Sequence, residues 1–364
     1  MAPVVSALSG HAPEIETRVV LTGQHTTLVD QVLAAFDLDR HYELGIMKDG
    51  QTLYDVVHGT LDGLRGVVEA FRPDVLLVQG DTATVFTAAL VGFFEHVRVG
   101  HVEAGLRSGD LQAPFPEEAF RRLTDVVTDY HFAPTSRARD RLLCENVPPQ
   151  RVHVTGNTVV DALRVVTALD RPIGNATLRR VVEDGATRLV LLTAHRRESF
   201  GEPIRELFGA VRTLVDDFDD IAVVYPVHPN PNVLAPAHEL LSGHPRIHLT
   251  DPLDYFDLVA ALQAASLVLT DSGGIQEEAP TFGTPVLVLR EVTERPEGVE
   301  AGVAELVGTD AKKILDRSHA ALNADAGDAK PDNPYGDGNA AARIADIVAA
   351  GLTGRARVTT DWDG

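Results

Sequence analysis

Five polar residues that can transfer protons or bind anions each follow a short apolar run typical of a buried β-strand. Asp81 follows "LLVQG", Glu103 follows "VGHV", His195 follows "LLTA", His228 follows "VVYPV" and Ser272 follows "VLTD". In a doubly wound α/β sheet, ligands bind at the carboxyl ends of the strands. We therefore expect these side chains to line a cleft where carboxylates and imidazoles exchange protons with a substrate.

The stretch "TDSGGIQEEAP" (270–280) predicts where an anionic group of that substrate binds. Gly273 and Gly274 allow close approach to the backbone, Ser272 can donate a hydrogen bond, and the helix that follows adds its dipole. Glu278, one turn into this helix, can reach a ribose hydroxyl. The alternatives are a tight turn with Ser272 as N-cap and a solvated Glu278.

Carboxylates and arginines are concentrated in "HVEAGLRSGDLQAPFPEEAFRR" (101–122). Glu103 follows a buried strand, where a carboxylate is costly unless it has a function or a partner. Glu117 and Glu118 begin a helix, where acidic residues are common because they interact with the helix dipole, and this alternative covers Glu118 well. Asp81 is either an N-cap of the next helix or a cleft carboxylate.

The stretch "TAHRRESFG" (193–201) places His195, Arg196 and Arg197 directly after a strand. Guanidinium groups bind phosphate and carboxylate bidentately, so a polyanionic ligand fits, although a surface charge pair beside a satisfied histidine is the alternative. The sequence contains no P-loop, no G-x-G-x-x-G, no G-x-S-x-G and no zinc-spaced Cys/His set. It therefore signals no nucleotide triphosphatase, dinucleotide oxidoreductase, serine-nucleophile or metal mechanism.

Short β-branched runs alternate with helical patterns, and this alternation occurs twice along the chain. A polar, arginine-rich stretch (168–187) separates the two series. We therefore expect two doubly wound, Rossmann-like α/β domains, residues 1–165 and 180–337, facing each other across a cleft. The last residues, "GRARVTTDWDG" (354–364), show no period and are expected to form a loose tail.

The chain of 364 residues carries 53 Asp and Glu against 32 Lys and Arg, a net charge of −21. This diffuse charge disfavours nucleic acid and membranes as partners, and it suggests a salt-rich cytoplasm in which screening reduces the self-repulsion. Cys144 has no second cysteine to pair with, and no apolar run approaches the ~20 residues of a membrane helix. We expect a halophilic, cytoplasmic protein.

Several motifs occur in one order between about residue 20 and about residue 348, and together they resemble the non-hydrolysing UDP-N-acetylglucosamine 2-epimerases. The resemblance implies two Rossmann-like domains of the glycosyltransferase-B type, a homodimer, and a C-terminal helix (338–352) that returns to the first domain. The motifs are "QGDT", "HVEAGLRSGDLQAPFPEE", "TGNTVVDAL", "TAHRRES", "YPVHPNPNV", "LTDSGGIQEEAP", "VLREVTERPE" and "NPYGDGNAAARI".

The resemblance implies that the anion is the diphosphate of a UDP-sugar. Ser272, Gly273 and Gly274 would hold phosphate, Glu278 the ribose, and Arg295 the diphosphate. The family inverts carbon 2 of UDP-N-acetylglucosamine to give UDP-N-acetylmannosamine, by elimination of UDP to a 2-acetamidoglucal and re-addition. This reaction moves no electrons, so no metal or redox cofactor is implied, and a cell-surface glycan is the usual destination of the product.

Four residues match the family's acid–base candidates: Asp81, Glu103, Glu117 and His195. We expect Asp81 and Glu103 to act at C2, Glu117 to shuttle protons or to position the substrate, and His195 to stabilise or protonate the leaving phosphate. Bacterial relatives bind a second UDP-N-acetylglucosamine as activator. The matching residues are Glu198 and His228.

Two departures from the family pattern matter. Phe120 stands where relatives usually have Asn, so we expect a polar contact beside Glu117 to be either lost or replaced by packing. The family also opens with a strand and a "GTRPE" loop ahead of the segment that matches "MAPVVSAL", and we expect their absence to leave a gap in the first domain. A glycosyltransferase of the same fold and a non-catalytic UDP-sugar-binding protein remain alternative functions.

Overall fold

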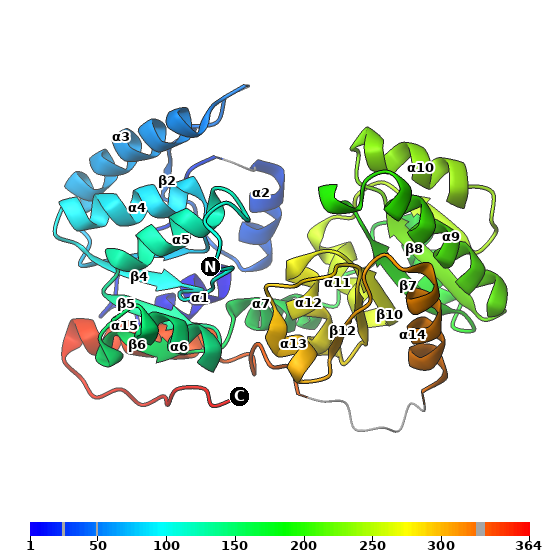
Figure 1. The fold of residues 1–364 in the computed structure, drawn as a ribbon. Helices are drawn as coiled ribbons and strands as arrows, with labels where there is room; N and C mark the ends of the chain where they lie inside the picture. Colours follow the sequence, from blue (N-terminus) through cyan, green and yellow to red (C-terminus); the bar gives the residue numbers. More distant parts are fainter. Residues whose placement is uncertain (24–25, 49, 325–331) are drawn as a thin grey trace. The chain divides into compact units, whose positions relative to one another are not determined.

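The computed structural model describes residues 1–364 except 24–25, 49 and 325–331. The chain folds into two compact units (Figure 1). The N-terminal unit comprises Met1–Ala162 and Tyr335–Gly364, and the C-terminal unit comprises Leu163–Pro334. The chain therefore enters the C-terminal unit once and returns to the N-terminal unit for its last helix.

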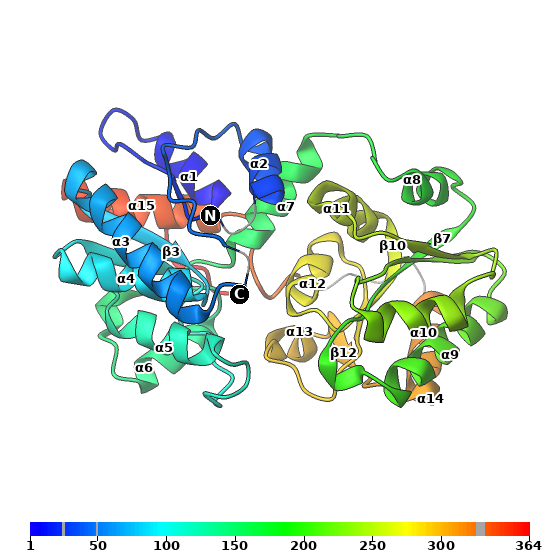
Figure 2. The same ribbon diagram turned by 90° about the horizontal axis from the view of Figure 1, so that it is seen from above.

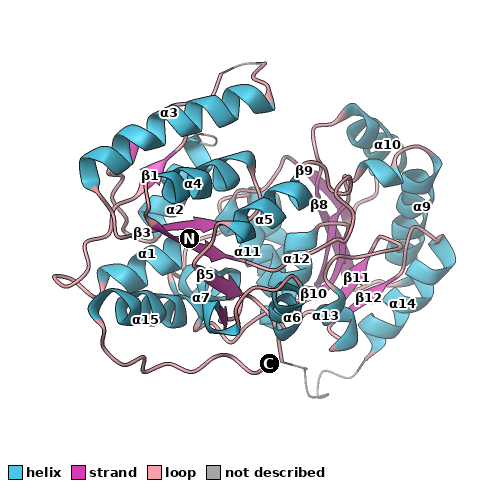
Figure 3. Ribbon diagram, turned by 60° about the vertical axis from the view of Figure 1, so that its left-hand side comes forward, coloured by secondary structure: helices cyan, strands magenta, loops and turns pink. Residues whose placement is uncertain are grey.

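The N-terminal unit contains a four-stranded parallel sheet in the order β3-β4-β5-β6 and a separate parallel pair, β1-β2. The central strands β4 and β5 of the larger sheet are buried almost throughout, as expected where helices cover both faces (Figure 3). The strands are β1 (Val20–Leu21), β2 (Tyr42–Glu43), β3 (Val75–Gln79), β4 (Arg98–Val102), β5 (Tyr130–Ala133) and β6 (Val152–Val154).

The helices of this unit pack through regularly spaced apolar residues. In α3 (Leu53–Phe71), Val56, Thr60, Leu64 and Val68 recur every four residues and form the buried face. The remaining helices are α1 (Ala2–Ser9), α2 (Thr26–Ala35), α4 (Ala83–Phe94), α5 (Glu117–Val126), α6 (Ser136–Cys144), α15 (Ala340–Thr353) and α7 (Thr158–Ala168), which continues into the C-terminal unit.

The last helix, α15, shares one hydrophobic core with α1 and with Val102 and Phe132 of the sheet (Figure 2). The segment after α15 is held in place, so the expectation of a loose tail is wrong. Asp346 of α15 accepts hydrogen bonds from the backbone N–H groups of Val358 (2.9 Å) and Thr359 (2.7 Å). The N–H of Trp362 donates to the carbonyl of Val154 at 2.8 Å. These tertiary hydrogen bonds order a segment that has no periodicity of its own.

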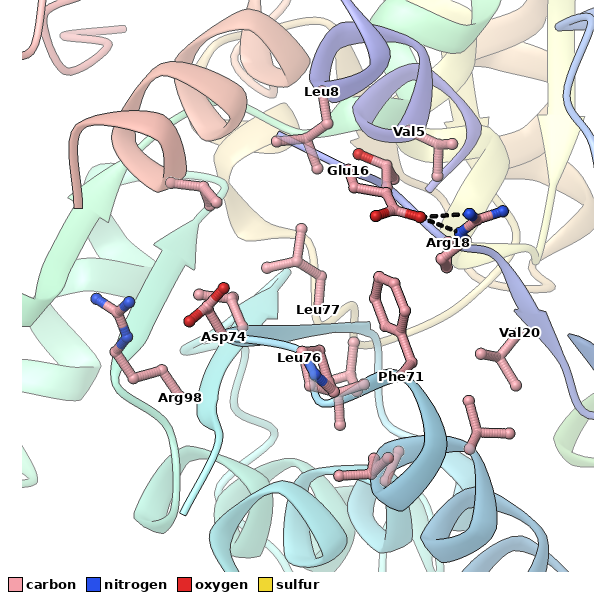
Figure 4. A pocket seen from close by; sticks show the side chains of 18 of the residues that line it. Val5, Leu8, Glu16, Arg18, Val20, Phe71, Asp74, Leu76, Leu77 and Arg98 are labelled. Atoms are coloured by element: carbon pink, nitrogen blue, oxygen red, sulfur yellow. Dashed lines mark hydrogen bonds and ion pairs between the residues drawn. The ribbon is translucent and has the colours of Figure 1, made fainter. Parts of the chain in front are cut away.

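The N-terminal unit contains a partly open cavity of about 760 Å³ between β1 and β3 (Figure 4). Val20 borders it from β1, Leu76 and Leu77 from β3, Leu8 from α1 and Phe71 from α3. Among the described residues, β1 pairs only with β2 and β3 pairs only with β4, so each sheet has one unpaired edge at this cavity. The cavity therefore lies between the small sheet β1-β2 and the larger sheet β3-β4-β5-β6.

The C-terminal unit contains one six-stranded parallel sheet in the order β12-β11-β10-β7-β8-β9. The strand order reverses between β7 and β10, which is the switch point of a doubly wound sheet. The strands are β7 (Arg188–Thr193), β8 (Ile221–Pro226), β9 (Ile247–Thr250), β10 (Ala265–Thr270), β11 (Val286–Val288) and β12 (Ala304–Leu306). The prediction of two Rossmann-like parallel α/β domains is confirmed.

Helices cover both faces of this sheet. One core layer packs α9, α10 and α14 against it through Leu207, Val233 and Ile314, and the other packs α8, α11 and α12 (Figure 2). None of the helices in the described ranges combines the length and apolar character that crossing a bilayer requires. The helices are α8 (Ala176–Glu183), α9 (Glu202–Asp217), α10 (Pro231–Leu241), α11 (Tyr255–Ala264), α12 (Gly273–Glu278), α13 (Pro296–Glu300) and α14 (Ala311–Asn323).

Candidate active site

Asp81 and Glu103 lie just beyond the carboxyl ends of the neighbouring strands β3 and β4. Both side chains are partly buried. The amide of Gln79 donates to Glu103 Oε1 at 2.9 Å, and Glu103 adopts a left-handed backbone conformation with φ of 67°. A non-glycine residue in this conformation is strained, and such strain is concentrated at functional sites. The sheet therefore brings two of the predicted carboxylates to one edge.

Asp81 is not the N-cap of the next helix. Thr82 fills that position, and its hydroxyl accepts from the N–H of Val85. The carboxylate of Asp81 instead forms an ion pair with Arg121 of α5. The N-cap alternative is therefore wrong, and Asp81 faces α5.

Arg121 connects Asp81 to the buried carboxylate of Glu118, which it contacts at 3.0 Å. Glu118 also accepts the backbone N–H groups of Ser108 (2.9 Å) and Gly109 (3.4 Å). Glu118 is fully buried, so its role is to hold the loop before α5 rather than to interact with the helix dipole from solvent. Sequence reasoning placed Arg121 in this cluster but missed its role, although its i, i+3 spacing from Glu118 was a signal.

Glu117 begins α5, and its Oε2 atom is buried without a hydrogen-bond partner among the described residues. A buried carboxylate oxygen of this kind costs free energy unless a ligand supplies a donor. The neighbouring Phe120 stacks on Phe86 with ring centroids 5.7 Å apart. Packing therefore occupies the position where the family pattern has an amide, close in the chain to Glu117.

In the C-terminal unit, His195 and Ser272 follow β7 and β10, the two adjacent strands at the switch point. Asp271, which is fully buried, accepts the backbone N–H groups of His195 (2.6 Å) and Arg196 (2.7 Å) through Oδ2. Asp271 therefore fixes the turn that carries His195. Sequence reasoning missed this role, and the only signal was a buried-strand ending in "LTD".

The environment of His195 favours its neutral form. Burial lowers the pKa of His195, and the charges of Arg196 and His228 lower it further, against the opposing effect of Asp271. The rings of His195 and His228 stack with centroids 5.3 Å apart. A neutral imidazole at pH 7 carries one N–H donor and one acceptor nitrogen, so His195 can hydrogen-bond a phosphate oxygen without a net charge.

Ser272 occupies the N-cap position of α12, but its hydroxyl makes no capping hydrogen bond. The hydroxyl thus has no capping role that would compete with a ligand. A side chain at Gly273 would place its Cβ 3.1 Å from Glu294 Oε1 and 3.9 Å from the guanidinium carbon of Arg295. These distances show that the glycine turn and Arg295 lie side by side. Gly274, the next residue of the turn, is exposed.

The two glutamates of α12 have different electrostatic environments. Glu277 forms an ion pair with Arg295. Burial raises the pKa of Glu278 to about 7, and the charge of Glu277 contributes in the same direction. Glu278 is partly buried in the structure, so the alternative of a solvated Glu278 is wrong.

Glu198, a residue expected in a second ligand site, forms an ion pair with Arg290 at 2.7 Å, and Arg290 also contacts Glu294 at 2.8 Å. Because Glu294 adjoins Arg295 in the chain and Gly273 in space, Glu198 is connected through Arg290 to the glycine turn. Among the described residues, no group of three or more His, Cys, Asp or Glu side chains has an arrangement that could hold a metal ion.

Comparison with known proteins decides the family. The family model for UDP-N-acetylglucosamine 2-epimerase matches residues 7–349. The chain belongs to the UDP-N-acetylglucosamine 2-epimerase family. A UDP-N-acetylglucosamine 2-epimerase of Yersinia pestis is 47% identical over 352 residues, covering 94% of this chain and 93% of that protein. The prediction of this family from the motif order is confirmed.

Solved structures of other epimerases have the same fold. The UDP-GlcNAc 2-epimerase of Neisseria meningitidis bound to UDP-GlcNAc is 40% identical, with a TM-score of 0.84 over 98% of this chain and 96% of that chain. The Methanocaldococcus jannaschii UDP-GlcNAc 2-epimerase in complex with UDP-GlcNAc and UDP is 32% identical, with a TM-score of 0.78 and 95% coverage of each chain.

Proposed function

We propose that this epimerase-family chain interconverts UDP-N-acetylglucosamine and UDP-N-acetylmannosamine. The observation that carries the proposal is the match along almost the whole chain to epimerases, one of them solved with UDP-GlcNAc bound. These comparisons do not favour the two alternative functions, a glycosyltransferase and a non-catalytic UDP-sugar-binding protein.

The proposed reaction balances without a redox cofactor. A base removes the proton from C2 while the bond between C1 and the UDP oxygen breaks, which leaves a 2-acetamidoglucal and UDP. The UDP oxygen then adds back to C1, and an acid delivers a proton to the opposite face of C2. Catalysis therefore requires an acid and a base at C2 and firm binding of the departing UDP.

The N-terminal unit supplies the groups for the proton transfers. We assign Asp81 and Glu103, at the ends of adjacent strands, to the two faces of C2, and Glu117 to shuttling or positioning. The ion pair with Arg121 and the hydrogen bond from Gln79 restrict the rotamers of Asp81 and Glu103. Preorganised carboxylates of this kind avoid the cost of ordering during the reaction.

The C-terminal unit supplies the groups that bind UDP. We assign phosphate contacts to Ser272, Gly273 and Gly274, with Arg295 on the diphosphate. Glu278 would accept hydrogen bonds from the ribose, and His195 would stabilise or protonate the phosphate that leaves C1. The uncapped hydroxyl of Ser272, the proximity of Arg295 to Gly273 and the lowered pKa of His195 support this assignment.

Three further assignments belong to the same proposal. Glu198 and His228 would contact a second, activating UDP-N-acetylglucosamine, as their links to Arg290 and His195 suggest. The chain would act as a homodimer in the cytoplasm. The product would enter the synthesis of a surface glycan.

Proton NMR of UDP-N-acetylglucosamine with the protein in D₂O tests the proposal. We expect the manno epimer to form with deuterium at C2. Glu103→Gln should abolish this exchange while UDP affinity, measured by calorimetry, stays within about threefold, because Glu103 is assigned to the proton transfer alone. Glu69→Gln, at an exposed position of α3, is the matched control and should retain wild-type exchange. Full exchange in Glu103→Gln would remove Glu103 from the mechanism, and binding without exchange in the wild type would leave a binding protein.

A further inference from the structure

The N-terminal unit contains a buried charged pair that none of the roles above uses. His101 lies on β4 and Asp125 on α5, and their residues are 0% and 4% exposed. Asp125 Oδ1 contacts His101 Nδ1 at 2.6 Å. The other ring nitrogen, Nε2, lies 2.8 Å from the carbonyl oxygen of Gly80. His101 therefore bridges α5 to the residue that precedes Asp81.

The partners of His101 specify its protonation. A carbonyl oxygen only accepts hydrogen bonds, so Nε2 must carry a proton, and an ionised Asp125 requires a second proton on Nδ1. Burial lowers the pKa of His101, but the charge of Asp125 and the hydrogen bonds to Asp125 and Gly80 raise it overall. Burial raises the pKa of Asp125, and its interactions with His101, Arg107 and His131 outweigh this effect and lower it to about 2. The pair is thus an imidazolium and a carboxylate.

Asp125 also holds the turn that follows Glu103. Its Oδ2 atom accepts the backbone N–H of Gly105 at 3.3 Å and the guanidinium of Arg107 at 2.7 Å. Gly105 has a φ of 85°, and a Cβ there would lie 2.3 Å from the carbonyl oxygen of Ala138, so the turn packs directly against α6 at a position where a side chain does not fit. One carboxylate therefore fixes the turn after Glu103 directly and the turn at Asp81 through His101.

Stability alone is a weak reason for such a pair. Replacing a buried ion pair by apolar residues of similar volume is often neutral or stabilising, because desolvation offsets the attraction. The hydrogen bonds of the pair, in contrast, are directional and end on the two turns that carry Asp81 and Glu103. A displacement of about 1 Å at a reacting group costs on the order of 100-fold in rate.

We propose that His101 and Asp125 are positioning residues that set the relative placement of the Asp81 and Glu103 carboxylates for proton transfer at C2. This inference rests on the proposed epimerase function. Both residues are buried, so they are assigned to positioning and not to contact with the substrate. Helix α5 thus orients Asp81 and Glu103 through the carboxylate of Asp125. The same helix begins with Glu117.

Asp125→Asn tests the proposal, with Asp346→Asn as its matched control. Both aspartates are buried on helices of the N-terminal unit and accept backbone N–H groups, but Asp346 holds the C-terminal segment. We expect both variants to lower the melting temperature. Asp125→Asn should lower kcat roughly 100-fold with KM for UDP-N-acetylglucosamine within about threefold, whereas Asp346→Asn should keep kcat within about threefold.

A second pair of variants separates positioning from folding. His101→Gln retains an amide that can donate to the Gly80 carbonyl, and His101→Phe retains ring volume without a donor. We expect kcat to decrease from wild type to His101→Gln to His101→Phe. Wild-type kcat in His101→Phe, or equal losses of kcat in Asp125→Asn and Asp346→Asn, would overturn the proposal.

A readout without turnover distinguishes failure of this inference from failure of the proposed function. In ¹⁵N NMR of histidine-labelled protein, the resonances absent from His101→Gln identify His101. We expect both of its ring nitrogens to be protonated at pH 7 in the wild type, whether or not the protein turns over substrate. One unprotonated ring nitrogen would overturn the charged pair, while wild-type turnover in the kinetic assay tests the proposed function by itself.

Discussion

Glu278→Gln separates the cost of a buried carboxyl group from its use in binding. The folded protein holds the Glu278 proton more tightly than the unfolded chain does, because the pKa is raised from 4.5 to about 7. Between these two values the folded state retains a proton that the unfolded state releases. The free energy of unfolding therefore falls as pH rises through this window, and stability is lower at pH 8 than at pH 5.

The magnitude follows from the two pKa values. At 1.36 kcal/mol per pKa unit, the ionised side chain costs about 3 kcal/mol at pH 8, and about 1 kcal/mol of this cost is already present at pH 5. Glutamine does not titrate. The stability of Glu278→Gln relative to wild type should therefore increase by about 2 kcal/mol between pH 5 and pH 8.

Urea unfolding followed by far-UV circular dichroism at the two pH values measures this difference. Glu206→Gln, at an exposed position of α9 in the same unit, is the matched control and should show no pH-dependent difference from wild type. If the difference between Glu278→Gln and wild type does not change with pH, Glu278 is not the desolvated carboxyl group inferred from the structure.

Glu278→Gln should stabilise the protein at pH 8 but weaken its binding of UDP. An ionised carboxylate accepts hydrogen bonds from both ribose hydroxyls, and a hydrogen bond to a charged group contributes about 1.5–3 kcal/mol. We therefore expect Glu278→Gln to weaken UDP binding roughly 10- to 100-fold at pH 8 in calorimetry. Unchanged affinity would remove Glu278 from the UDP site and leave the stability prediction intact.

Two further predictions concern stability. Thr60→Val should raise the free energy of unfolding by about 1 kcal/mol, because the Thr60 hydroxyl beside the cavity is buried with no hydrogen-bond partner among the described residues. A lower midpoint of urea unfolding in this variant would show that the hydroxyl makes a stabilising hydrogen bond. Raising the KCl concentration from 0.1 to 1 M should raise the melting temperature. The added salt shortens the Debye length from about 10 to about 3 Å and screens the repulsion within a chain of net charge −21. A lower melting temperature at 1 M KCl would show that attractive ion pairs on the surface dominate.

The sequence alone sufficed for the class of fold and for the family. Alternating β-branched runs and helical patterns predicted the parallel sheets, because the periods of strands and helices are local properties of the chain. The polar residues after the apolar runs were correctly placed at strand ends for the same reason. The order of the motifs along the chain was enough to predict the family.

Other features of the candidate site depend on contacts between residues distant in sequence. Ser272 could be an N-cap or a ligand donor by its type, and only the structure shows its hydroxyl outside the capping role. Asp81 was likewise ambiguous until Thr82 was seen to cap α4 and Arg121 to pair with Asp81. Capping and pairing depend on rotamers and partners, which periodicity does not specify.

The sequence by itself determined the elements and the family of this protein, because local periodicity and motif order are written along the chain. The tertiary structure decided which strand ends are adjacent, that Asp271 holds the turn at His195, and that Asp125 joins His101 to the turn at Gly105. It also decided that the C-terminal segment is fixed by Asp346. These contacts join residues far apart in sequence or in separate elements, and their free energies depend on burial and on the order of strands in the sheet, which exist only in the folded chain.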